Sequence, residues 1–230
     1  MSLRRRLASV DRALLLAVLL IGAALFAFFR IASEVSEGDT MAFDRAILTG
    51  LRTPGDPALP IGPAWLSEAM TSLTAFGSMT GLLLVCAAVA GFLLTARRAR
   101  TALFVLAATS SGIALAGLLK LVYARPRPAL VPHLVDVTSS SFPSGHATDS
   151  AIVYLTLAAL LARTVPERAV RIYLLAAAMV LTLLIGVSRV YLGVHWPSDV
   201  VAGWSMGAAW ALACSLAYSR LRIRQSETGS

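Results

Sequence analysis

The sequence has 230 residues, of which 57% are hydrophobic and only 14% are charged. A soluble domain has about 25% charged residues, so this composition and a mean hydropathy of +0.76 exclude an ordinary soluble protein. Lys and Arg outnumber Asp and Glu by 20 to 12, but the excess lies in short clusters between apolar segments. This pattern indicates an integral membrane protein and argues against nucleic-acid binding.

The first apolar segment covers residues 13–29 and follows the basic cluster Arg4–Arg6. It is long enough to cross a bilayer core with slight thinning. A cleaved signal peptide is the alternative, but its apolar region is usually about 7 to 15 residues long, with a small-residue cleavage site after it. Because Phe28, Phe29 and Arg30 stand there instead, we expect a retained first helix.

Residues 31–66 are polar and interrupted by Pro and Gly, so we expect an exposed loop. Within it, Phe43, Ile47 and Leu51 recur every four residues. This spacing favours a short helix on the membrane surface, and a helix packed on the protein is the alternative.

Five further apolar segments are long enough to cross a membrane. They cover residues 69–96, 101–120, 146–163, 172–188 and 199–219. The fold class is therefore expected to be all-α, a polytopic membrane protein in which one domain, residues 1–230, forms a bundle of six transmembrane helices.

Small residues recur every four positions in the third and sixth of these spans. They are Ala108, Gly112, Ala116, Gly203, Gly207 and Ala211. Such spacing predicts close helix packing, although chance in an alanine-rich sequence is the alternative. Cys86 and Cys214 lie in apolar spans without the spacing of metal ligands, and we interpret them as small apolar side chains rather than as disulfide partners or ligands.

Basic residues orient the bundle, because cytoplasmic connections carry an excess of Lys and Arg. The basic segments are Arg4–Arg6, Arg97–Arg100, Arg163–Arg171 and the C-terminal Arg220, Arg222 and Arg224. We expect these segments and both termini on the cytoplasmic side of a bacterial inner membrane. The loop 31–66 and the polar segments 120–145 and 189–199 then meet on the extracytoplasmic side, at the outer membrane-water interface.

The first of these polar segments contains Lys120 and Arg127. Pro128 pushes Arg127 out of helical geometry, so both cations can point back to one anion. Basic residues at the end of a span are usually membrane anchors, but here they lie on the wrong side for that role. Arg125 precedes a proline in the same way and is a rival or a helper of Arg127.

The second segment is Pro-Ser-Gly-His at 143–146, directly before an apolar helix. Ser144 suits a helix cap, Gly145 allows a ligand close to the backbone, and the helix start favours anions. His146 then stands where it can protonate a leaving oxygen. An ordinary helix start with an interfacial histidine is the alternative, and this tetrapeptide alone favours it.

The third segment contains Arg189, His195 and Asp199. Pro197 suits the first turn of a helix, which places Asp199 about one turn from His195, able to accept its ring N–H. Arg189 offers a planar fork for phosphate oxygens. An aromatic-belt histidine beside a tryptophan is the weaker alternative. His133 has no such partners and is interpreted as an ordinary loop residue.

Jointly the three segments resemble the signature of the type 2 phosphatidic acid phosphatases, the lipid phosphate phosphatases: Lys-x6-Arg-Pro, Pro-Ser-Gly-His and Ser-Arg-x5-His-x3-Asp. All three parts are present and in order, and the doubled Arg-Pro is the one departure. The resemblance implies that His195 is the nucleophile, Asp199 orients it and His146 is the acid. It also implies phosphate binding by a further set, Lys120, Arg127, Ser144, Gly145 and Arg189.

The expected function is hydrolysis of a lipid phosphate or diphosphate through a phosphohistidine, without metal or other cofactor, because fixed cations take the metal's electrostatic role. Undecaprenyl diphosphate, phosphatidylglycerol phosphate and phosphatidate are the candidate substrates. A lipid phosphotransferase using the same intermediate is the alternative. A vanadate haloperoxidase is disfavoured by six spans, and an anion transporter by the absence of paired broken helices at mid-membrane.

Overall fold

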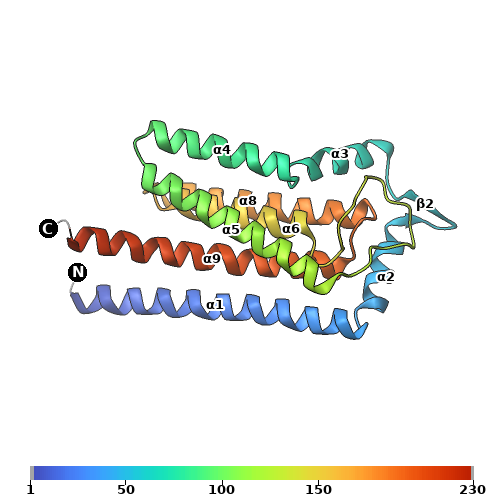
Figure 1. Cartoon of the computed structure of the whole chain (residues 1–230), viewed down its shortest axis with the longest axis horizontal. Helices are drawn as coiled ribbons and strands as arrows, with labels where there is room; N and C mark the ends of the chain where they lie inside the picture. The colour runs from blue at the N-terminus through green and yellow to red at the C-terminus, as the bar shows by residue number, and fades with distance from the viewer. Residues whose placement is uncertain (1–2, 229–230) are drawn as a thin grey trace.

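The computed structural model of this chain describes the backbone of residues 3–228 and the side chains of residue 12 and residues 14–221. The side chains of Arg4–Arg6, Arg222 and Arg224, on which part of the orientation argument depends, lie outside that range. Within it, the fold is a bundle of long helices (Figure 1). The long helices are α1 (Leu3–Glu37), α4 (Met79–Thr95), α5 (Ala99–Tyr123), α8 (Arg168–Tyr191) and α9 (Pro197–Thr228).

Shorter elements complete the bundle. They are α2 (Met41–Gly50), α3 (Ala64–Ala75), the run α6 (Gly145–Ser150), η1 (Ala151–Leu155) and α7 (Thr156–Ala162), and the antiparallel strands β1 (Arg52–Thr53) and β2 (Asp56–Pro60). The run from α6 to α7 is one apolar segment of 18 residues with a π-helical turn in its middle. It lies inside the bundle and packs on α5, α8 and α9.

Five helical segments between residues 3 and 228 are long and apolar enough to cross a membrane, and α3 with α4 adds a sixth as a span bent by 51°. This confirms the prediction of an all-α, multi-pass membrane protein. The bend was not predicted. It occurs where Phe76, Gly77 and Ser78 separate the helices, and the Ser78 side chain caps α4 by accepting the Gly81 N–H at 3.1 Å.

Residues 31–66 are more regular than the expected loop. The first helix continues to Glu37 instead of ending near residue 29, since no Pro or Gly stands between Phe29 and Gly38. After it, α2 packs on the protein through Asp44 and Leu48, both 0% exposed, while Phe43 and Ile47 face outward. The packed alternative was therefore correct for one face of α2, and the short β-hairpin that follows was not predicted.

The predicted small-residue contacts are present. The Trp210 indole N–H donates to the Ala108 carbonyl at 2.8 Å, and a Cβ at Gly112 would lie 2.7 Å from that nitrogen. A Cβ at Gly207 would collide with Ala151 on the α6–α7 run. These close contacts bring α5 and the α6–α7 run against α9.

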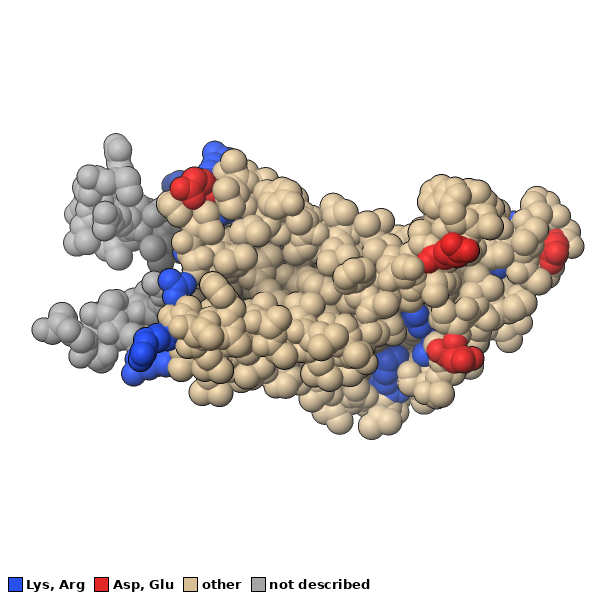
Figure 2. Space-filling model, turned by 90° about the horizontal axis from the view of Figure 1, so that it is seen from above, with Lys and Arg blue, Asp and Glu red and all other residues tan. Residues whose placement is uncertain are grey.

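Different elements lie at the two ends of the bundle. α1 begins and α9 ends at the same end of the bundle as the α4–α5 connection, whereas α2 and the β-hairpin lie at the opposite end (Figure 1). On the face shown in Figure 2, acidic and basic side chains lie toward the two ends, with a wide band of other residues between them. That band has the character of a membrane-spanning zone.

Candidate active site

The three polar segments of the sequence converge at the end of the bundle that carries α2. Here α5 and α8 end, α6 and α9 begin, and the segment 124–144 folds over them. A cavity of about 350 Å³ lies between these elements. It is lined by six of the eight predicted site residues, Lys120, Arg127, Gly145, His146, Arg189 and His195.

The turn between α8 and α9 buries His195 against the first turn of α9. Pro197 begins that helix as predicted, and His195 Nδ1 lies 3.4 Å from Asp199 Oδ2. The same oxygen accepts the Trp196 backbone N–H at 2.9 Å and a short hydrogen bond from the Ser141 hydroxyl. Asp199 is 0% exposed and lies behind His195 rather than in the cavity wall.

The other ring nitrogen of His195 faces the cavity. Arg127 Nη1 donates toward Nε2 at 3.2 Å, which fits a ring whose proton is on Nδ1, facing Asp199. His195 is 1% exposed, and burial lowers its pKa to about 3 despite the opposing influence of Asp199. At neutral pH the imidazole is therefore uncharged, and its Nε2 lone pair can attack an electrophile.

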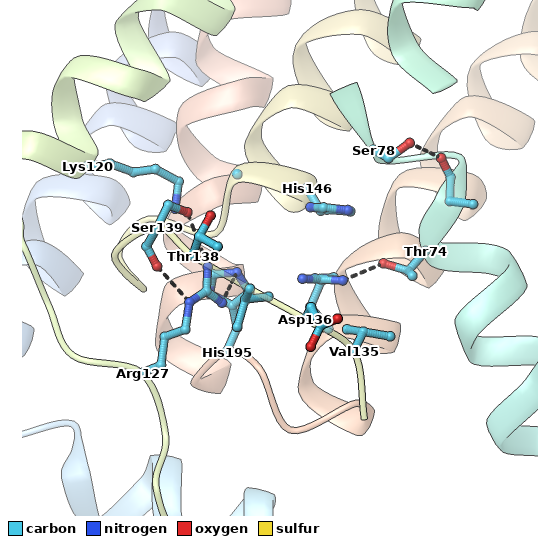
Figure 3. Close-up of a pocket in the computed structure, with 14 residues that line it drawn as sticks. Thr74, Ser78, Lys120, Arg127, Val135, Asp136, Thr138, Ser139, His146 and His195 are labelled. Atoms are coloured by element: carbon cyan, nitrogen blue, oxygen red, sulfur yellow. Dashed lines mark hydrogen bonds between the residues drawn. The ribbon is translucent and has the colours of Figure 1, made fainter. Parts of the chain in front are cut away.

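The segment 124–144 holds two cations at the cavity. Arg127 donates to the carbonyls of Ser139 (2.7 Å) and Val194 (2.6 Å), and Lys120 Nζ donates to the Ser140 carbonyl at 2.8 Å. Figure 3 shows both side chains at the same cavity, next to His195. Burial lowers the pKa of Arg127, but its ordinary value is so high that it stays charged.

Arg189 is the third cation and comes from the last turn of α8. It is 3% exposed, and its Nη1 donates to Thr74 Oγ1 at 2.9 Å, while its Nε has no hydrogen-bond partner among the described residues. Thr74 is the last buried residue of α3 before the bend. The bent span thus supplies the side chain that holds Arg189.

His146 borders the cavity at the start of α6 (Figure 3). The α3–α4 bend approaches it closely, because a Cβ at Gly77 would lie 3.3 Å from His146 Cδ2. At the neighbouring position, a Cβ on Gly145 would lie 3.2 Å from Lys120 Cε. Gly145 therefore lets the Lys120 side chain cross the helix start toward the cavity.

Ser144 differs from expectation. It occupies the N-cap position of α6, but its side chain forms no capping hydrogen bond. Its Oγ is buried and has no partner among the described residues, and it does not line the cavity. The position is fixed by the backbone instead, since Ser144 N–H donates to the Asp199 carbonyl at 3.0 Å and the Thr148 hydroxyl donates to the Ser144 carbonyl at 2.8 Å.

Several residues of the site were missed by sequence reasoning. Ser141 hydrogen-bonds Asp199, and Thr74 hydrogen-bonds Arg189. A run of serines before the second motif was the available signal for Ser141, whereas Thr74 is one of several hydroxyl residues in an apolar span and nothing distinguished it. His133 does not line the cavity, and its Nε2 donates to the Pro128 carbonyl at 2.8 Å. Among the described residues, no three His, Cys, Asp or Glu side chains are grouped to ligate a metal ion.

A multi-pass helical bundle that ends in a cationic cavity, with a buried histidine held by a carboxylate, has the features of a membrane phosphatase for lipids. The sequence pattern of the PAP2 superfamily matches residues 99–223, which include all three motifs, and the chain belongs to that superfamily. It is a membrane lipid phosphatase, a hydrolase of phosphoric ester or diphosphate bonds.

Similar proteins agree with this assignment. The chain is 34% identical over 187 residues to phosphatidylglycerophosphatase B of Bacillus subtilis (strain 168), covering 80% of this chain and 87% of the relative. It is 31% identical over 189 residues to a lipid A 1-phosphatase of Rhizobium etli, covering 70% and 77%. The crystal structure of a transmembrane PAP2 type phosphatidylglycerolphosphate phosphatase from B. subtilis superposes with a TM-score of 0.79 at 28% identity, covering 87% of this chain and 96% of that one.

Proposed function

We propose that His195 attacks the phosphorus of a lipid phosphate through Nε2 and forms a phosphohistidine that water then hydrolyses. One observation carries this proposal: Nδ1 of His195 faces the buried Asp199, while Nε2 faces Arg127 at the wall of the cavity. A histidine oriented in this way needs no deprotonation before attack. The carboxylate of Asp199 stabilises the imidazolium character that develops as the bond forms.

Lys120, Arg127 and Arg189 neutralise the phosphoryl oxygens, on which charge is spread in the transition state. All three line the cavity, and the Nε of Arg189, which has no partner among the described residues, is a donor available to a phosphate oxygen. Gly145 allows close approach at the helix start. For Ser144 we propose that its unpaired hydroxyl donates to phosphate after a small rotation of its side chain.

His146 protonates the leaving oxygen of the lipid and then activates the water that cleaves the phosphohistidine. Its position at the cavity wall, without a hydrogen bond to any described side chain, leaves both ring nitrogens available for this work. The same residue can serve both steps, because the acid of the first step is the base of the second.

The chemistry is tested by brief reaction with a ³²P-labelled lipid phosphate, acid-free quenching and analysis for phosphohistidine, which is labile to acid and stable to base. We expect label in the wild-type protein, in excess EDTA, and none in His195→Gln. Free phosphate released without an acceptor lipid distinguishes hydrolysis from phosphoryl transfer. Label on His146 instead of His195, or loss of activity in EDTA, would contradict the mechanism.

For the substrate we propose phosphatidylglycerol phosphate, because the B. subtilis relative that covers most of this chain is a phosphatidylglycerophosphatase. Phosphatidate and undecaprenyl diphosphate are the rivals. Purified protein should show its highest kcat/KM for phosphatidylglycerol phosphate in a panel of the three lipids in mixed micelles. A higher kcat/KM for undecaprenyl diphosphate would contradict the proposed substrate but not the proposed mechanism.

We further propose that the chain is one membrane-embedded domain of a bacterial inner membrane, with both termini in the cytoplasm and the cavity outside. In support, α1 begins and α9 ends at the same end of the bundle as the basic α4–α5 connection. In a variant lacking Cys86 and Cys214, a cysteine at Thr138 should label with an impermeant thiol reagent in intact cells. A cysteine at Ser226 should not, and the reverse result would place the cavity in the cytoplasm.

A further inference from the structure

A buried arginine lies behind the His195–Asp199 pair, on the side away from the cavity. Arg125 is 8% exposed, and its guanidinium bridges two carboxylates that are both 0% exposed. Nη1 lies 2.6 Å from Asp199 Oδ1, and Nη2 lies 2.8 Å from Asp44 Oδ2 on α2. Burial of such a charge is unfavourable unless its partners are well placed, so this arrangement depends on all three side chains together.

Residues of the His195 turn also contact the same arginine. Arg125 Nη1 also donates to Ser198 Oγ at 2.8 Å, and its guanidinium lies 5.5 Å from the centre of the Trp196 ring. Asp44 in turn accepts the Ser198 backbone N–H at 2.9 Å and the Ser198 hydroxyl at 2.6 Å. Two segments that are far apart in sequence therefore hold the first turn of α9 from outside the cavity.

This contact fixes the oxygen of Asp199 that His195 does not use. Oδ2 faces the imidazole, and Oδ1 is occupied by Arg125. With one oxygen held by a guanidinium, the carboxylate plane cannot rotate freely, and its second oxygen stays aimed at Nδ1.

We propose that Arg125 and Asp44 are positioning residues of the nucleophile: they act through Asp199, holding its carboxylate toward His195, and do not bind phosphate. The inference rests on the proposed role of His195. It also separates the two arginines of the doubled Arg-Pro sequence. Arg127 lines the cavity, whereas Arg125, on the other side of Pro126, does not.

Charge gives this role a measurable signature. Arg125 carries one positive charge between two carboxylates, so loss of Arg125 alone leaves two negative charges near His195 and favours the protonated, non-nucleophilic imidazole. Loss of Asp44 alone removes a negative charge and therefore favours the neutral imidazole. Loss of both side chains leaves the net charge around His195 unchanged. Other charged or titratable groups also face the cavity around His195, and all of them are retained in these variants: Lys120, Arg127, Asp136, His146 and Arg189.

The experiment compares Arg125→Gln, Asp44→Asn, the double variant, Arg125→Lys and the control Arg45→Gln, which removes a positive charge from the exposed face of α2. We measure kcat and KM on phosphatidylglycerol phosphate between pH 5.5 and pH 8. Arg125→Gln should lose about 10- to 100-fold in kcat, the range usual for a side chain that orients a reacting group from behind. Its KM should stay within about twofold, as expected when an interaction of the transition state alone is lost.

The loss in Arg125→Gln should be larger at pH 5.5 than at pH 8, and Asp44→Asn should show no such acid-side loss. The double variant should regain the wild-type pH dependence, and Arg125→Lys should keep it with an intermediate kcat. Arg45→Gln should match the wild type. If Arg125→Gln does not fold, the double variant, whose net charge is unchanged, is used for the test instead. It should have a lower kcat than the wild type and the same KM.

Two results would overturn the inference. The first is a raised KM with unchanged kcat in Arg125→Gln or the double variant, which would make Arg125 a phosphate ligand. The second is an equal loss in Arg125→Gln and Asp44→Asn at every pH without recovery in the double variant, which would indicate a purely structural pair. Phosphohistidine trapping in the wild-type protein is run in parallel, because absence of label there rejects the proposed function rather than this inference.

Discussion

The first span and the turn before the last span are opposites in composition and in surroundings. In α1, only 6% of the apolar membrane-spanning window is buried inside the protein, so most of its Leu, Val and Phe side chains face outward, while Phe28 is buried. The turn and helix start at 191–200 contain histidine, serine and aspartate, and every one of their residues is buried. In a soluble protein the apolar segment would be inside and the polar one outside.

The specific interactions of this membrane protein lie in the buried polar turn rather than in the span that faces lipid. Leucine gains little by leaving lipid for the protein interior, because both are apolar. A buried imidazole, carboxylate or guanidinium must instead find exact partners, and each misplaced group costs stability. The polar turn is therefore the region whose geometry the sequence determines most tightly, and the lipid-facing span is the most tolerant of substitution.

The strongest test of this contrast is His195→Gln in the buried turn. The variant keeps a similar shape but has no nucleophilic nitrogen, so turnover should fall by about 10⁴-fold or more. Phosphate release and phosphoenzyme labelling are the measurements, with thermal unfolding in detergent as the control for folding. Activity close to wild type would remove His195 from the mechanism.

His146→Gln should separate the two histidines. A lipid alkoxide is a poor leaving group and needs a proton, whereas nitrophenolate hardly does. General acid help contributes about 10²- to 10⁴-fold, so kcat should fall by that factor on a lipid monophosphate. Phosphoenzyme formation from p-nitrophenyl phosphate should fall much less, and trapped intermediate should accumulate. Equal losses on both substrates would indicate a binding or structural role.

Substitutions in the buried turn should lower the stability of the protein more than substitutions on the lipid-facing side of α1. Leu192 is 0% exposed and packs beneath the segment 124–144, so Leu192→Ala should lower the free energy of unfolding by about 2–5 kcal/mol. The matched variant is Leu19→Ala, at a side chain that is 61% exposed on α1. It should lower the free energy of unfolding by less than about 0.5 kcal/mol. SDS titration in detergent measures both free energies of unfolding, and similar losses would show that the Leu19 side chain is packed against another protein surface.

The smallest expected effect concerns the α3–α4 bend. Thr74→Val keeps the shape of the side chain but removes the acceptor of Arg189, so kcat/KM should fall about 10-fold, as for a lost hydrogen bond to a charged group. The control is Thr71→Val, whose hydroxyl is exposed and bonds only its own helix. If the two variants behave alike, the bent span does not support the site.

The sequence predicted the convergence of the three motifs more closely than the internal shape of the spans. The three motifs converge because span order and alternating direction bring their ends together, and six of the eight predicted residues line one cavity. Asp199 also takes its predicted place behind His195. The unpaired hydroxyl of Ser144 was not expected, because capping preference depends on residue type and the observed contacts depend on tertiary packing.

Hydropathy located the spans but not their internal breaks. An uncharged run from 69 to 96 contains no proline, and at the bend Gly77 packs so closely on Ile185 and His146 that a Cβ there would collide with Ile185. Likewise, nothing in the sequence around Asp44 indicates that this side chain is buried, since its partner Arg125 lies 81 residues away in sequence. Long-range ion pairs of this kind leave no local pattern.

The meeting of four span ends at one cavity has a consequence for the direction of the reaction. Its two products prefer different phases: inorganic phosphate is soluble in water, and the dephosphorylated lipid stays among the acyl chains. Each product leaves the site by partition into its own medium, so the reverse reaction requires them to meet again at one point on the membrane surface. Separation of the products by the bilayer itself therefore favours net hydrolysis.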